Sequence, residues 1–171
     1  MRRFVFFIMF FVCMSSHAQQ KCELPDSTYW ACADSGRLCH VYPESTVTVQ
    51  TEAKGITFTA IHFEPKNAKY GWVGGNDSTG HVILMRSIDT GKNWYPTLIP
   101  VGLKSDQVDR IQSVKGGRML FVLLKSGRAL MSHDFGCTYN RMMSDPVAGT
   151  NYEKGRKLFE ESIRHFDGNT K

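Results

Sequence analysis

Hydrophobic and polar residues alternate in short runs along most of this chain, and the runs come in pairs. Each pair encloses a Ser-Gly or Thr-Gly step, and glycine supplies the positive φ that a tight hairpin turn requires. Apolar and β-branched residues on both sides of each turn favour strands. The pattern therefore predicts three β-hairpins, formed by residues 29–33 with 38–42, 71–75 with 81–85, and 119–124 with 129–131.

A further alternating run precedes the second and the third hairpin. Residues 56–63 alternate with period two, as a half-buried strand does, and residues 110–114 occupy the same place before the third hairpin. The units recur about every 45 residues, which matches one propeller blade. We predict a mainly β fold of antiparallel β-hairpin repeats: about three propeller-blade-like units of an incomplete propeller. Whether they form an open curved sheet, a small sandwich or half of a dimer stays open.

Near its C-terminal end the chain changes to a helical period. A stripe typical of an amphipathic helix is formed by Tyr152, Leu158, Phe159, Ile163 and Phe166. Thr150 with Glu153 fits a capping box, and Gly168 is a suitable stop. Arg164 and His165 would lie in the last turn, where positive charge suits the helix dipole. We predict a helix at about 151–166, packed on the sheet.

The first residues are typical of a secretory signal peptide. Arg2 and Arg3 precede an apolar run over residues 4–14, which is shorter than the roughly 20 residues of a membrane-spanning helix. Small residues at Ser16 and Ala18 suit cleavage after Ala18. We therefore predict a signal peptide over residues 1–18, a single β-repeat domain over residues 19–171 and a periplasmic location, with no membrane span after cleavage.

Charge and motifs exclude several function classes. The whole chain has a net charge of +5, which falls to +3 once the two arginines of the leader are removed, and no block of Lys or Arg indicates nucleic-acid binding. The sequence has no G-x-S-x-G, H-E-x-x-H or phosphate-loop motif. We expect no enzyme activity, no cofactor and no metal. Scattered polar positions, rather than a catalytic group, are predicted for His40, His62, His81, His133 and His165.

Four cysteines follow the leader, an even number that suits an oxidising compartment. We predict a Cys32–Cys39 disulfide across the first hairpin. A Cys22–Cys137 disulfide would follow if the N-terminal residues complete the last unit. A two-residue Ser35-Gly36 loop would make Cys32 and Cys39 a hydrogen-bonded pair, which is a less usual disulfide site, so other pairings stay open.

One octapeptide occurs twice, 45 residues apart. Its fixed positions S-x-D-x-G-x-x-W, with Tyr for Trp in the second copy, are Ser87, Asp89, Gly91 and Trp94, then Ser132, Asp134, Gly136 and Tyr139. The first unit departs from the pattern, with Val41 and Pro43 in place of Ser and Asp.

This octapeptide resembles the Asp-box, or BNR repeat, of sialidase-like propellers. Residues 60–74 also resemble blades of the photosystem-assembly type, and the whole resemblance covers about residues 56–140. In the resembled families the box lies on a hairpin away from the active site. We therefore expect Asp89 and Asp134 to build turns by accepting backbone hydrogen bonds, and the box aromatics to pack beside them.

The overall layout resembles periplasmic immunity proteins encoded beside phospholipase toxins of type VI secretion systems. That resemblance implies a stoichiometric inhibitor whose partner is a toxin, with a lipase effector as the expected type. An envelope assembly or chaperone-like factor is one alternative, and a carbohydrate-binding Asp-box module is another.

Two sets of residues are relevant to these functions. Sugar stacking would use Trp30, Trp72 or Trp94, although we prefer a packing role for them. Contacts with a protein partner are predicted for Tyr70, Asn76 and Asp77, which we place in the longest loop of the second unit. A homodimer is a further option.

Overall fold

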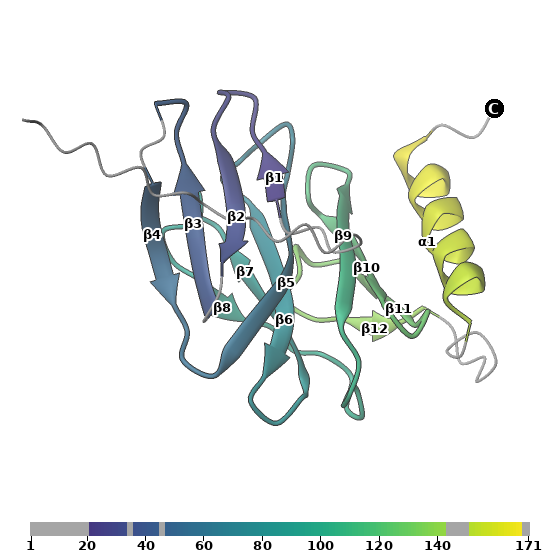
Figure 1. Cartoon of the computed structure of the whole chain (residues 1–171). Coiled ribbons are helices and arrows are strands. Elements are labelled where there is room, and N and C mark those ends of the chain that lie inside the picture. The colour runs from purple at the N-terminus through teal and green to yellow at the C-terminus, as the bar shows by residue number, and fades with distance from the viewer. Residues whose placement is uncertain (1–20, 34–35, 45–46, 143–150, 169–171) are drawn as a thin grey trace, which may run out of the picture.

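The computed structural model describes residues 21–33, 36–44, 47–142 and 151–168. They form three four-stranded antiparallel sheets, which match the three predicted blade-like units, and the predicted C-terminal helix (Figure 1). Blade 1 contains β1 (Lys21–Glu23), β2 (Tyr29–Ala33), β3 (Arg37–Val41) and β4 (Val47–Glu52). Blade 2 contains β5 (Ile56–Phe63), β6 (Gly71–Asp77), β7 (Val82–Ser87) and β8 (Tyr95–Pro96). Blade 3 contains β9 (Val108–Val114), β10 (Met119–Leu124), β11 (Ala129–Ser132) and β12 (Asn140–Arg141).

Each blade is a simple meander in which consecutive strands pair. The hairpins and the runs at 56–63 and 110–114 were visible in the sequence, because a half-buried strand alternates with period two, and the second run begins two residues earlier in the structure, at Val108. The fourth strands were not predicted. In blades 2 and 3 they are only two residues long, too short for any periodic pattern to show.

The blades pack face to face through their first strands. Strand β5 contacts β1 and β2 on one side and β9 on the other. Its side chains alternate accordingly, so that Ile61 belongs to the core shared with blade 1 and Ala60 to the core shared with blade 3. Blade 2 is therefore buried on both faces, which explains why β5 is almost continuously buried after its second residue.

Helix α1 (Tyr152–Asp167) covers the outer face of blade 3 (Figure 1). Phe159 is fully buried there against Phe121, and Ile163 and Phe166 pack beside it. The predicted range was correct to within one residue, and Gly168 ends the helix in the left-handed region as expected. The N-cap differs from the predicted capping box: Asn151 accepts the N–H of Lys154 at 3.2 Å, while Thr150 lies outside the described residues.

The predicted role of the N-terminal residues was wrong. Strand β1 pairs with β2 inside the first unit and does not complete the last one. Cys22 therefore belongs to the core between blades 1 and 2, where its Sγ accepts the N–H of Phe63 at 3.3 Å, whereas Cys137 lies in blade 3. Both predicted disulfides are absent, since all four described cysteines are free thiols.

Register explains why Cys32 and Cys39 do not pair. Ala33 lies opposite Arg37, so the loop contains three residues rather than two, and Cys39 lies opposite Ala31 instead of Cys32. A shift of one residue turns the side chain to the other face of the sheet. Cys32 consequently packs toward blade 2 and Cys39 points away from it. Burial raises the pKa of both thiols.

The predicted leader, residues 1–18, lies outside the described residues. Within the part of the chain that the structure describes, no helix has the length and apolar character needed to cross a bilayer.

Candidate functional site

The two octapeptide motifs form nearly identical turns. In blade 2, Ser87 Oγ accepts the N–H of Gly91 at 2.8 Å and donates to Asp89 Oδ1 at 2.9 Å. The same carboxylate accepts the backbone N–H of Asn93 at 2.9 Å. Thr90 and Gly91 both adopt positive φ, of 61° and 81°, which lets the chain reverse tightly.

The turn of blade 3 repeats this geometry. Ser132 Oγ accepts the N–H of Gly136 at 3.0 Å and donates to Asp134 Oδ1 at 2.7 Å, and Thr138 N–H donates to the same oxygen at 3.0 Å. Burial raises the pKa of Asp134, but hydrogen bonds from Thr138 and Ser132 outweigh it, so the pKa lies below its usual range. The Thr138 hydroxyl also donates to Asp134 Oδ2 at 2.7 Å, so both carboxylate oxygens are engaged, which agrees with a turn-building role.

The motif glycines join each blade to the one before it. A side chain at Gly91 would overlap the ring of Trp30 from blade 1, and one at Gly136 would lie 2.6 Å from Nε1 of Trp72 from blade 2. Across its hairpin, each of these two tryptophans lies opposite the residue that directly precedes the motif serine, or that precedes Val41, which takes the place of the serine in blade 1. Phe121 holds the equivalent place in blade 3, and it packs on α1 instead of a further blade.

This arrangement decides the role of the tryptophans. Trp30 and Trp72 are each only 1% exposed, so neither ring can stack on a sugar from solvent. Trp94 is half-buried and packs edge-on against Trp30, with ring centroids 6.2 Å apart. The packing role expected for these residues is the one the structure gives them.

The predicted partner contacts do not lie in one loop. Tyr70 precedes β6 and packs on Phe135 with centroids 5.3 Å apart, whereas Asn76 and Asp77 are the last residues of the same strand. A seven-residue strand separates the two positions by about 20 Å. Asn76 donates to the carbonyl of Asp106 at 2.6 Å, so its side chain joins blade 2 to the start of blade 3.

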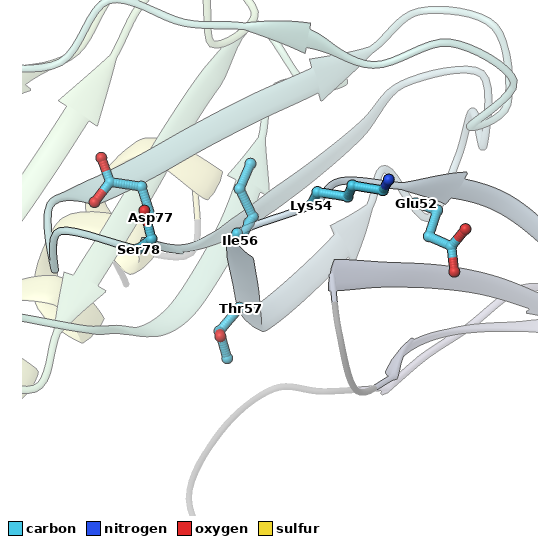
Figure 2. A pocket seen from close by; sticks show the side chains of 7 residues that line it. Glu52, Lys54, Ile56, Thr57, Asp77 and Ser78 are labelled. Atoms are coloured by element: carbon cyan, nitrogen blue, oxygen red, sulfur yellow. The ribbon is translucent and has the colours of Figure 1, made fainter.

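Asp77 does border a hollow between blades 1 and 2, of about 620 Å³. Its lining residues are Glu52, Lys54, Gly55, Ile56, Thr57, Asp77 and Ser78. Figure 2 shows Asp77 and Ser78 on one side, Glu52 on the other, and Lys54 and Ile56 between them. Hydrogen bonds from Thr79 and His81 lower the pKa of Asp77 and hold its carboxylate in its own turn. The hollow is a shallow surface of mixed charge rather than an enclosed site.

A buried polar cluster between β5 and β9 was not predicted. Ser113 N–H donates to His62 Nε2 at 3.1 Å, and Ser113 Oγ lies 2.7 Å from that nitrogen while donating to Glu64 Oε2 at 2.7 Å. All three residues are buried, and burial lowers the pKa of His62 to about 4. The Ser113 hydroxyl lies between the His62 imidazole and the Glu64 carboxylate, and it thereby links blade 3 to blade 2. In a catalytic triad the histidine lies between the nucleophile and the acid, so this cluster differs from a triad.

The described residues contain no group of three His, Cys, Asp or Glu side chains placed to hold a metal ion. The sequence offered no local signal for the His62 cluster, because Ser113 of blade 3 is 51 residues from His62 and 49 residues from Glu64.

Comparison with known proteins supports the fold. No family model and no curated protein matches the chain. Among solved structures, YCF48 bound to D1 peptide superposes with a TM-score of 0.60 and 14% identity, over 75% of this chain and 40% of that one. An ancestral GH74 enzyme gives a TM-score of 0.63 with 13% identity, over 77% of this chain and 19% of that one.

YCF48 from Cyanidioschyzon merolae gives a TM-score of 0.52 with 14% identity, over 74% of this chain and 39% of that one. The chain therefore spans less than half the length of these propeller proteins. At such identities the similarity concerns the fold, which is that of consecutive propeller blades.

Proposed function

We propose that this chain is a protein-binding module that presents a rigid stack of three blades to a partner. The observation that carries the proposal is that the motif carboxylates and the tryptophans between the blades are used inside the fold. Asp89, Asp134, Trp30 and Trp72 are all engaged in turns or in packing between blades. Turns, edges and the linkers between blades then remain to make contacts with other molecules.

Similarity to YCF48 supports this proposal. That protein has been observed bound to the D1 peptide, and its fold includes a stack of blades like this one. Such a stack is stiff because each blade is buried against its neighbour, so little conformational entropy is lost when a partner binds.

In its finer form, the proposal identifies the partner as a secreted antibacterial toxin, of the lipase type, which this chain neutralises in the periplasm by stoichiometric binding. The layout of leader, Asp-box hairpins and four further cysteines supports it. An envelope assembly or chaperone-like role would instead require several partners and no protection against a toxin.

Co-expression with the toxin encoded beside it tests the finer form. We expect cells that export the full chain to survive the toxin, and cells whose copy lacks residues 2–18 to die, because the inhibitor would then stay outside the periplasm. Equal survival with and without the chain would contradict the toxin proposal.

The broader proposal is tested by gel filtration of a tagged full chain isolated from its native envelope after mild cross-linking. A partner protein in fixed stoichiometry is expected. A chain that elutes alone, with no cross-linked protein, would rule out a protein-binding role.

A further inference from the structure

The linker that leads from β8 to β9 is held rigidly at several points. Leu98 N–H donates to the carbonyl of Cys137 at 2.9 Å, and the carbonyl of Leu98 accepts the N–H of Tyr139 at 2.8 Å. Farther along, the carbonyl of Leu103 accepts the N–H of Val82 at 2.9 Å. The linker is thus fastened to blade 3 at its start and to blade 2 at its end.

Its side chains divide sharply between inside and outside. Leu103 is buried and Ile99 packs on the core between blades 2 and 3. Leu98 and Val101 point outward and are 72% and 89% exposed, the two highest values among the large exposed hydrophobic side chains. Two aliphatic side chains held out on an ordered backbone differ from the scattered exposed apolar residues of an ordinary surface.

Cationic side chains lie beside the Val101 end of this apolar pair. Arg141 Nη2 donates to the carbonyl of Val101 at 2.8 Å, Arg128 Nη1 donates to the carbonyl of Gly102 at 3.5 Å, and Lys104 is exposed on the linker itself. The nearby Asp106 lies 4.0 Å from Arg128, but its side chain is only 5% exposed and its oxygens accept hydrogen bonds from Ser126. At the Val101 end of the linker the solvent side therefore carries an excess of positive charge, while the Leu98 end lies beside Thr138, which donates to the Asp134 carboxylate.

We propose that this linker surface, formed by Leu98, Val101, Lys104, Arg128 and Arg141, binds an acidic segment of a partner protein that bears large apolar side chains. The inference rests on the proposed protein-binding function and assigns its site and the chemistry of its partner. Apolar anchors that are already rigid contribute most of the affinity at an interface, while peripheral charges set specificity and association rate.

A second exposed apolar pair provides a matched control. Val47 and Val49 of β4 are 39% and 53% exposed on the outward face of blade 1. They belong to residues 47–51, which carry no charge, and β4 has a bulge in its pairing with β3. This pair resembles the linker pair in its exposed aliphatic side chains, but it lies on a strand beside Arg37 and Glu52, which face each other, and not on a linker beside three cations.

The test is a selection of short random peptides, displayed on phage, against the full chain. Selected peptides would be synthesised with a fluorophore, and their Kd would be measured by anisotropy at low and high salt. We expect enriched peptides that combine Asp or Glu with Leu, Ile or Phe. Replacing Leu98→Ser and Val101→Ser together should weaken binding about tenfold or more, and Val47→Ser with Val49→Ser should leave it within about twofold.

Lys104→Gln tests the charge separately, because its side chain is exposed and anchors none of the backbone hydrogen bonds described above. It should slow association and reduce the salt dependence of Kd. Circular dichroism and urea unfolding are to be measured for each variant, and we expect every variant to be folded because the changed side chains are exposed.

Each other outcome is informative. Peptides that bind but ignore the Leu98 and Val101 changes, or that are enriched in Lys and Arg, overturn the linker surface and leave the protein-binding function standing. Loss of binding on changing Val47 and Val49 moves the site to β4 and likewise overturns the inference. Failure to enrich any peptide overturns the linker surface, and if the chain also elutes alone in the native cross-linking experiment, the protein-binding function is overturned as well.

Discussion

The indole N–H of Trp72, on the second strand of blade 2, donates a hydrogen bond of 3.0 Å to the carbonyl oxygen of Phe135 in the motif turn of blade 3. Trp30 occupies the equivalent position in blade 1, but its Nε1 is buried and has no hydrogen-bond partner among the described atoms. The two tryptophans pack in the same way, but only Trp72 forms a hydrogen bond through its indole N–H, so variants of the two can be compared directly.

Replacing each tryptophan by phenylalanine should therefore have unequal effects on stability. Both changes remove similar volume from a core, but Trp72→Phe also leaves the carbonyl of Phe135 without its partner, whereas Trp30→Phe removes an unpaired N–H. We expect Trp72→Phe to lower the free energy of unfolding by about 1–2 kcal/mol more than Trp30→Phe, measured by urea denaturation. A larger loss for Trp30→Phe would contradict the assigned hydrogen bond.

The motif glycines should tolerate alanine poorly. Gly136 has a φ of 78° and lies against Trp72, so a methyl group would meet both backbone strain and the indole ring. We expect Gly136→Ala to cost about 3 kcal/mol. Gly80→Ala is the control, because Gly80 has a φ of 81° but open space around it, and it should cost only about 1–2 kcal/mol. Equal losses would mean that the contact between blades contributes little.

Gly155, inside α1, gives a prediction opposite to helix propensity. Alanine is favoured over glycine in a helix by about 1 kcal/mol, yet a methyl group at Gly155 would overlap the carbonyl of Gly127 in the β10–β11 turn. Gly155→Ala should therefore destabilise the protein, by about 2 kcal/mol net in urea unfolding. Lys154→Ala, at an exposed neighbouring position, should change stability by less than about 0.5 kcal/mol. A stabilised Gly155→Ala protein would show that α1 does not approach the turn this closely.

The burial of His62 predicts a loss of stability in mild acid. Its pKa in the folded protein is about 4, below the 6.5 of an unperturbed histidine, so the unfolded chain binds the proton more tightly. Stability is therefore fully present above about pH 6.5 and falls as the pH approaches 4, by about 3 kcal/mol from this residue. His40, whose pKa is lowered by burial despite the opposing charge of Asp26, adds to the loss in the same range.

His62→Gln separates the two histidines, because the glutamine carbonyl can still accept the N–H of Ser113 but cannot be protonated in this range. Urea unfolding at several pH values should give a weaker pH dependence for His62→Gln than for the wild-type chain between pH 6.5 and 4. Identical profiles would place the acid sensitivity elsewhere. The motif carboxylates cannot account for it, since the lowered pKa values of Asp89 and Asp134 confine their effect to more acidic solutions.

Some features of the candidate site were predicted from the sequence and others were not. The motif turns were predicted by residue and by role, because Ser87, Asp89 and Gly91 act on one another within five positions. The grouping of Tyr70 with Asn76 and Asp77 failed, because the strand predicted at 71–75 separates Tyr70 from the other two residues and itself extends over Asn76 and Asp77. The linker surface was missed, because an apolar run such as Leu98 to Leu103 does not reveal which of its members face outward.

By itself, the sequence determined the hairpins, the two motif turns and the terminal helix, since these depend on residues close together in the chain and leave a period or a spacing. Tertiary structure alone decided the rest. It set the pairing of β1 within blade 1, the one-residue register that separates Cys32 from Cys39, and the packing of each tryptophan on the next glycine turn. His62 and Ser113 come together only because the blades stack on one another. The physical reason is that the periodic pattern of a strand shows which of its faces is buried, but not which residues of another blade cover that face.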